Sequence, residues 1–310
     1  MKQRITMTPT GETPAICDYE GSAYRTDFWE GQGREYEDLA ERIALRRLLP
    51  SSGQRLLEIG AGFGRLTEVY AGFEQVVLLD YSKSQLRQAQ AHLGRGERYI
   101  YVAGDFYNPP FVDSLFDGAT LIRTIHHAQD VPRVLQQVRR VLAPAGTFIL
   151  EFANKRHLKA ILRYWLRRQT WNPFALEPVE FVELNFDFHP KWMAARLQEA
   201  DFTIQRRLAV SHFRVPLLKR YIPARLLAAM DGLVQWSGAW WQLSPSIFIR
   251  ARQRKSGPPP PADGFFRCPR CGGRDWQRSE IMLTCKTCDA RWAIDDGIHD
   301  FKSPLMKRET

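Results

Sequence analysis

Short apolar runs alternate with helix-like segments through the first half of the chain. After a helical pattern over residues 35–49, the apolar runs are RLLEIG, QVVLLD, RYIYVAGD, DGATLIRTIHH and GTFILEF. Runs that are apolar at consecutive positions are typical of parallel strands covered by helices on both faces. The pattern therefore predicts an α/β fold with a doubly wound, mostly parallel sheet. Two later runs, residues 202–210 and 245–254, are expected to add two further strands.

A glycine-rich turn follows the first predicted strand. The stretch EIGAGFG places Gly60, Gly62 and Gly64 before a predicted helix over residues 65–72. Glycines let the backbone pass close to a ligand, and the first turn of a helix offers free N–H groups. The turn is a candidate ligand site, although a tight strand–helix connection without a ligand would have the same pattern.

Acidic side chains lie at the ends of three successive predicted strands, at Glu58, Asp80 and Asp105. At the position of Asp80, a carboxylate can accept hydrogen bonds from both ribose hydroxyls of a nucleoside. Asp105 is placed to contact an adenine amino group, with Phe106 against the ring. Pyrophosphate prefers basic or neutral surroundings, so these acids favour a cationic ligand such as S-adenosylmethionine, with NAD as the alternative.

Residues 53–152 resemble the class I S-adenosylmethionine-dependent methyltransferases. The matching stretches are LLEIGAGFGRLTE, VVLLDYSKSQLRQAQ, GDFYNPPFVDSLFDGAT and IRTIHHAQDVPRVLQQVRRVLAPAGTFILEF. The resemblance implies a methyltransferase enzyme with a seven-stranded Rossmann-like sheet whose last strand is antiparallel. It also implies that Gly60 and Gly62 lie under the methionine moiety, that Asp80 holds the ribose, and that Asp105 and Phe106 take the adenine. Tyr81 and Arg123, which follow the second and fourth strands, are expected in the same site.

Two features depart from the family pattern. Pro109-Pro110-Phe111 stands where a Leu-Pro-Phe is usual, and a long basic and aromatic stretch covers residues 155–243. The second feature leaves the methyl acceptor open between RNA, protein and a hydrophobic small molecule. A non-catalytic protein that uses the cofactor fold to dock on nucleic acid or a protein partner is the alternative function.

The segment after the fourth strand, from Arg123 to His127, faces the ligand crevice in folds of this kind. His127 is the candidate general base, which methyl transfer needs only if the acceptor carries a proton when it attacks. The alternative is that the histidines cap or pack the following helix.

The N-terminal segment is rich in aromatic residues and arginine. In similar enzymes this segment folds over the cofactor as a lid, and aromatic faces attract a sulfonium ion. Tyr24 and Arg34 are therefore expected near the cofactor. The alternative is that the segment begins a helix of the core.

Four cysteines, Cys268, Cys271, Cys285 and Cys288, form a C-x2-C-x13-C-x2-C pattern near the C-terminus. This spacing predicts a tetrahedral zinc site, with iron as the alternative, and four thiolates leave no open position, so the site is structural. Residues 265–301 resemble the zinc ribbons of small proteins that activate tRNA and release-factor methyltransferases. The resemblance suggests a recruiting or stabilising module fused in cis, although a ribbon that only stabilises the fold is also consistent.

Positive charge is concentrated in the middle of the chain. Residues 151–255 contain 18 Lys/Arg and 8 Asp/Glu, and residues 155–171 read as a basic amphipathic helix. Segment 155–255 can dock on RNA or a protein, contact a membrane surface, or remain a solvated face. The alternative for the amphipathic helix is that it packs its apolar face on the domain. The N-terminus has no signal pattern, and the chain has no apolar run long enough to span a bilayer, so we expect a cytoplasmic protein.

These observations predict four regions in chain order. The regions are an N-terminal helical lid segment (1–52), a methyltransferase domain with insertions at 155–200 and 211–243 (53–255), a proline-rich linker (256–264) and a small zinc ribbon (265–310). Both insertions are expected to be mainly helical.

Overall fold

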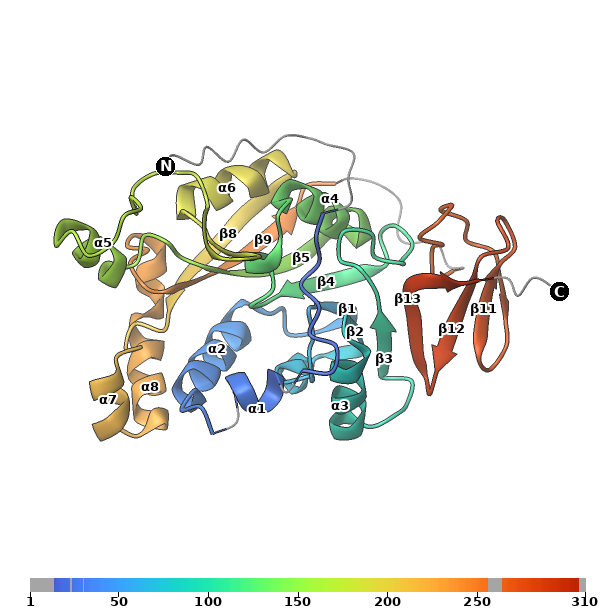
Figure 1. Cartoon of the computed structure of the whole chain (residues 1–310), viewed down its shortest axis with the longest axis horizontal. Helices are drawn as coiled ribbons and strands as arrows, with labels where there is room; N and C mark the ends of the chain where they lie inside the picture. Colours follow the sequence, from blue (N-terminus) through green and yellow to red (C-terminus); the bar gives the residue numbers. More distant parts are fainter. Residues whose placement is uncertain (1–13, 23, 30, 256–263, 307–310) are drawn as a thin grey trace.

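The computed structural model describes residues 14–22, 24–29, 31–255 and 264–306 (Figure 1). Seven strands of the main domain lie in the order β3-β2-β1-β4-β5-β9-β8. Only β9 runs against its neighbours, so the predicted doubly wound, Rossmann-like sheet with an antiparallel last strand is confirmed. The strands are β1 (Gly53–Ile59), β2 (Phe73–Asp80), β3 (Tyr99–Ala103), β4 (Phe116–Leu121), β5 (Leu142–Ala153), β8 (Phe202–Val210) and β9 (Ser246–Gln253).

Helices cover both faces of this sheet, and each face has its own apolar core. Figure 1 shows α4 and α6 above the sheet and α2, α3 and α8 below it. Ser82 caps α3 by accepting a hydrogen bond from the Gln85 N–H, as its position in the sequence predicts. The bounds are α1 (Tyr24–Phe28), α2 (Glu35–Leu48), α3 (Lys83–Leu93), α4 (Val131–Val141), α6 (Pro190–Glu199) and α8 (Ala224–Val234).

The helix predicted over residues 65–72 is wrong in extent, because only a 3₁₀ turn, η1 (Thr67–Tyr70), forms there. The segment connects β1 to β2 in few residues, and Thr67 and Tyr70 turn inward to the buried Glu58. A second 3₁₀ turn, η2 (Ile125–His127), follows β4.

The first insertion contains less helix than predicted. Its basic helix is α5 (Leu158–Trp165), shorter than the predicted 155–171, and β6 (Val179–Val182) pairs with β7 (Asn185–Asp187) in a hairpin before α6. The second insertion is mainly helical, with α7 (Pro216–Tyr221), α8 and the 3₁₀ turn η3 (Gln235–Ala239). No helix among the described residues combines the length and the apolar character that a membrane span requires.

The C-terminal module continues the main sheet. Its strands are β10 (Trp276–Arg278), β11 (Met282–Cys285), β12 (Arg291–Asp295) and β13 (Ile298–Leu305). Strand β13 pairs in parallel with β3, with Ile298 opposite Tyr101 and Asp300 opposite Ala103. In the part of the chain that the structure describes, the sheet therefore has 11 strands rather than the expected seven. The physical reason is that β3 would otherwise be an edge strand with unpaired backbone groups, which β13 satisfies.

Candidate functional site

A recess lies where the parallel strands end, beside the glycine turn. It holds about 620 Å³ of empty space, part of it open to solvent. Seven of the residues that the sequence singled out meet there, although they are far apart along the chain: Gly60, Gly62, Asp80, Tyr81, Phe106, Arg123 and His127. The lining residues are Cys17, Tyr19, Ile59, Gly60, Gly62, Leu79, Asp80, Tyr81, Gln85, Gly104, Phe106, Arg123, Thr124 and His127.

Gly60 and Gly62 of the turn are required for different reasons. A Cβ at Gly60 would lie 2.1 Å from Oγ1 of Thr124, so only glycine lets the turn pack against the end of β4. At Gly62, with φ +53, a Cβ would meet nothing within 4 Å. Gly62 therefore faces the open space of the recess and leaves its backbone accessible to a ligand.

The carboxylate of Asp80 is tied to the backbone on both sides. Its Oδ2 accepts a hydrogen bond from the Gly62 N–H (2.8 Å), and its Oδ1 accepts one from the Ser82 N–H (2.9 Å). Burial raises the pKa of Asp80 above its ordinary value, although the two hydrogen bonds act to lower it. A fixed carboxylate beside an open glycine can accept hydrogen bonds from a hydroxylated ligand such as a nucleoside.

Tyr81 and Phe106 provide aromatic surface on the other side of the recess. Asp105, which is next to Phe106, does not line it: its Oδ1 accepts a hydrogen bond from the Tyr107 N–H at 2.7 Å. Burial raises the pKa of Asp105 as well. The Asp105 side chain thus shapes the turn that carries Phe106 into the recess.

The N-terminal segment covers the recess with residues that the sequence did not single out. Cys17 and Tyr19 line it, and Figure 1 shows residues 14–22 crossing the end of the sheet as an extended thread. Glu20 fixes the segment by accepting hydrogen bonds from the backbone N–H groups of Lys83 (2.6 Å) and Ser84 (3.1 Å) at the start of α3.

His127 has partners at both ring nitrogens. Nδ1 lies 2.9 Å from the Leu184 carbonyl oxygen, and Nε2 lies 3.2 Å from the Tyr19 hydroxyl. Because a carbonyl oxygen can only accept, Nδ1 carries the proton, and Nε2 of the neutral ring accepts from Tyr19. Burial lowers the pKa of His127, which favours this neutral form. The arrangement presents a basic nitrogen at the wall of the recess.

A second cavity of about 440 Å³ lies on the other side of the glycine turn and shares Gly60, Gly62 and Arg123 with the recess. Glu58 lines this cavity rather than the recess, and it accepts hydrogen bonds from the Thr67 (2.6 Å) and Tyr70 (3.3 Å) hydroxyls. Burial raises the pKa of Glu58 to about 7.

The remaining residues that the sequence indicated lie elsewhere. Gly64 packs toward Ala89 and Leu93 of α3. The Arg34 guanidinium lies 5.6 Å from the Trp29 ring centroid and borders a hollow outside the second cavity. The side chain of Tyr24 is outside the part that the structure describes.

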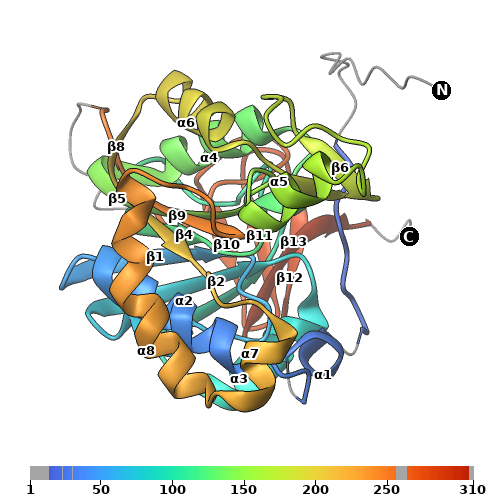
Figure 2. The same ribbon diagram turned by 90° about the vertical axis from the view of Figure 1, so that its left-hand side faces the viewer.

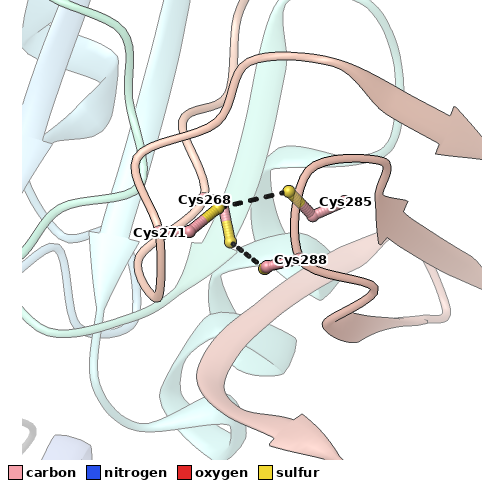
Figure 3. Close-up of side chains that lie close together, drawn as sticks. All are labelled: Cys268, Cys271, Cys285 and Cys288. Atoms are coloured by element: carbon pink, nitrogen blue, oxygen red, sulfur yellow. Dashed lines mark hydrogen bonds between the residues drawn. The ribbon is translucent and has the colours of Figure 1, made fainter.

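The four cysteines of the ribbon converge on one point (Figure 3). Their Sγ atoms all lie within 4.8 Å of one another, with 3.8 Å between Cys268 and Cys288 and 3.5 Å between Cys271 and Cys285. Thiolates bound at about 2.3 Å around a tetrahedral zinc ion would be roughly 3.8 Å apart. The donor set and its spacing therefore fit zinc.

Comparison with known proteins agrees with this geometry. Residues 57–150 match the model of a methyltransferase domain. An O-methyltransferase of Aspergillus sclerotiorum, resE, is 32% identical over 144 residues, which are 43% of this chain and 54% of that protein. A demethylmenaquinone methyltransferase of Clavibacter sepedonicus is 30% identical over 148 residues, which are 46% of this chain and 59% of that protein. The chain thus spans less than two thirds of the length of either relative.

Among solved structures, one chain of a Haloferax volcanii complex is similar in fold. The complex joins the Trm112 methyltransferase activator to a protein described as a methyltransferase. The TM-score is 0.52 at 16% identity, and the match covers 75% of this chain and 97% of that one.

Glu58 gives the fold a measurable pH dependence. Its pKa is raised from 4.5 to about 7 in the folded protein, so the unfolded chain releases this proton first as the pH rises. We expect the contribution of Glu58 to the free energy of unfolding to fall by about 3 kcal/mol as the pH rises from 4.5 to about 7. Urea denaturation at several pH values in this range should show a falling free energy of unfolding in the parent. The Glu58→Gln variant should lack this decrease. The exposed Glu68→Gln is the control, and equal slopes in parent and Glu58→Gln would contradict the assignment.

Proposed function

We propose that this chain, whose residues 57–150 form a methyltransferase domain, transfers a methyl group from S-adenosylmethionine to an acceptor. The observation that carries the proposal is the recess in which Gly62 faces open space and Asp80 lies fixed beside it. The relatives are methyltransferases over the same part of the chain.

The residues present fit the cofactor. Gly60 and Gly62 would lie along its methionine part, Asp80 would hold the ribose hydroxyls, and Tyr81 and Phe106 would flank the adenine. The cofactor supplies an electrophilic methyl group on a positively charged sulfur. The chain's own task is then to align the acceptor with that methyl group and to exclude water, because this displacement depends mostly on positioning.

We assign His127 as a general base for acceptors that lose a proton. Its Nε2 carries the lone pair, and the hydrogen bond from Nδ1 to the Leu184 carbonyl fixes that tautomer. The Tyr19 hydroxyl, 3.2 Å away, occupies the position from which an acceptor hydroxyl would approach. An acceptor would therefore displace Tyr19 or pass its proton through it.

The C-terminal module is assigned as a structural zinc ribbon that stabilises the cofactor recess in cis. Lys302 of β13 lies 5.1 Å from the Tyr81 ring centroid and 3.8 Å from the Glu20 carboxylate. Lys83, at the start of α3, pairs with Asp295 (3.3 Å) and Asp300 (3.1 Å) of the ribbon. The ribbon thus contacts both the wall and the covering segment of the recess.

A label-transfer experiment tests the activity and separates acceptor classes. Purified protein, radiolabelled S-adenosylmethionine and an extract of the source cells are incubated, and RNA, protein and organic-soluble fractions are counted. One of the named relatives is a demethylmenaquinone methyltransferase, so we expect label in the organic fraction. Cofactor binding without label in any fraction would instead support a non-catalytic binding protein.

Asp80 is the test of the cofactor site. Asp80→Asn removes the charge that holds the ribose, and we expect the affinity for S-adenosylmethionine to fall at least about tenfold in calorimetry. Asp117→Asn is the matched control. Asp117 of β4 also accepts two backbone hydrogen bonds, from the N–H groups of Gln54 and Arg55, at the end of β1 away from the glycine turn. Equal affinity of the two variants would overturn the assignment.

His127 predicts the pH dependence of the reaction. The neutral ring is the active form, and burial keeps its pKa below 6.5. The rate of label transfer at saturating cofactor should be constant near neutral pH and fall in acid as the ring becomes protonated. His127→Gln should remove this acid limb together with most of the rate, whereas the exposed His92→Gln should retain both. An unchanged profile in His127→Gln would exclude the role.

The zinc assignment is tested by metal analysis. The purified chain should contain about one zinc ion, and Cys285→Ser should lose it because a four-thiolate site needs every ligand. Cys17→Ser, the fifth cysteine, should keep the metal. The Cys285 variant should also bind S-adenosylmethionine more weakly, because loss of the metal would weaken the pairing of β13 beside the recess. Iron in the purified chain, or full zinc content in the Cys285 variant, would contradict the assignment.

A further inference from the structure

Large apolar side chains are unusually exposed on α5, α7, α8 and the residues after η3. Trp240 is 81% exposed, Leu233 80%, Trp241 73% and Tyr221 71%. Figure 2 looks onto this side of the molecule, with α5, α7 and α8 toward the viewer, and Figure 1 shows the same helices along one edge. Further exposed members are Leu158, Leu162, Trp165, Leu166, Leu217, Leu226 and Trp236. Soluble proteins rarely leave such a contiguous apolar area uncovered.

The two segments that carry these side chains adjoin each other. The Leu158 N–H at the start of α5 donates to the Leu243 carbonyl oxygen (2.9 Å). The Asn154 side-chain amide donates to the Gln242 carbonyl oxygen at 2.9 Å. We call the combined area, formed by residues 155–176 and 211–245, the α5–α8 surface.

The charge of the α5–α8 surface has one sign. Residues 155–176 contain six Lys/Arg and no acid, and residues 211–245 contain four Lys/Arg and one acid, Asp231. Asp231 is buried and accepts hydrogen bonds from the Tyr36 hydroxyl and the His212 N–H, so it contributes no exposed negative charge.

Neighbouring elements modify this charge at the edges. Arg47 of α2 and Arg206 of β8 lie 5.4 and 5.0 Å from the Trp236 ring centroid. Glu37 of α2 pairs with Lys219 at 2.9 Å, and the β6–β7 hairpin carries Glu180 and Glu183 at the border. Residues 155–176, which contain α5, carry no acid, so this part of the α5–α8 surface remains basic.

We infer that the α5–α8 surface docks on an anionic lipid bilayer. Tryptophan and tyrosine favour the boundary between headgroups and acyl chains, and leucine inserts below it. Lysine and arginine extend along apolar surface and reach anionic headgroups, and each adds to the attraction. The side chains exposed here are the combination that an interfacial helix presents.

Other occupants fit less well. A second copy of the chain would bring two surfaces of the same sign together in a symmetric contact, which repels. RNA would neutralise the arginines but would leave Leu217, Leu226 and Leu233 uncovered, because phosphates and bases offer little to aliphatic side chains.

The surface also borders a row of hollows that reaches the second cavity, on the other side of the glycine turn from the recess. The second cavity shares Trp29, Phe63 and Arg65 with a hollow of about 1420 Å³, whose far wall is Pro223, Ala224 and Arg225 at the start of α8. A further hollow of about 770 Å³ extends from there to Tyr221. If the proposed methyl transfer is correct, the membrane would hold a lipophilic acceptor beside these hollows.

Vesicle binding of the full chain tests the inference without any need for activity. Co-sedimentation is measured with vesicles of phosphatidylcholine alone and of phosphatidylcholine with phosphatidylglycerol. We expect binding to the anionic vesicles only, weakened by salt. Arg167→Glu and Arg168→Glu should each lower the partition coefficient by about fivefold or more. The combined Trp240→Ser and Trp241→Ser variant should lose most of the remaining binding.

Matched controls lie on the ribbon. Arg278→Glu, and the combined Ile281→Ser and Met306→Ser variant, change exposed side chains of the same kinds and should leave vesicle binding unchanged. Circular dichroism and thermal unfolding verify that each variant is folded, independently of cofactor binding. Equal losses in the ribbon controls, no anionic preference, or displacement of the vesicles by equimolar duplex RNA would overturn the inference. Vesicle binding in a chain that fails to bind S-adenosylmethionine would refute the proposed function alone.

Discussion

Two buried carboxylates hold Arg123 in the wall between the recess and the second cavity. The Arg123 N–H donates to Glu151 of β5 (2.8 Å), and its guanidinium donates to Glu41 of α2 (2.6 Å), which also pairs with Arg65. Burial alone would raise the pKa of Glu41, but the two arginines hold it below the ordinary value. Charges removed from water are tolerated only when paired in this way, so α2, the glycine turn and the ends of β4 and β5 are fixed relative to one another. Both cavities depend on that arrangement.

The ribbon and the main domain form one sheet, so the proposed zinc site is connected to the recess through the backbone. The cysteines hold one end of the ribbon, while β13 at its other side pairs with β3 and brings Lys302 to Tyr81. Phe266 packs beside both Phe111 and Phe301, so the junction has an apolar core as well as a backbone ladder. A site without an open coordination position can thus influence the recess through strand geometry alone.

Local patterns in the sequence predicted the order of strands and helices, the late strands β8 and β9, and the convergence of Gly60, Gly62, Asp80 and His127. The alternation of side chains along a strand explains the position of Glu58: it precedes the last residue of β1, so it points to the opposite face from the recess. That signal was present in the sequence. The Tyr19–His127 contact and the β3–β13 pairing join residues 108 and about 200 positions apart, and no local pattern encodes such contacts.

The pairing of β13 with β3 also has a consequence for the order in which the protein is made. Strand β3, with the sequence YIYVA, leaves the ribosome long before its partner, and its edge stays open until the ribbon has been synthesised and, under the proposed zinc assignment, has bound its metal. An open apolar edge is a template for pairing with other chains. Metal supply during synthesis would then determine how much of the nascent protein reaches the folded state and how much aggregates.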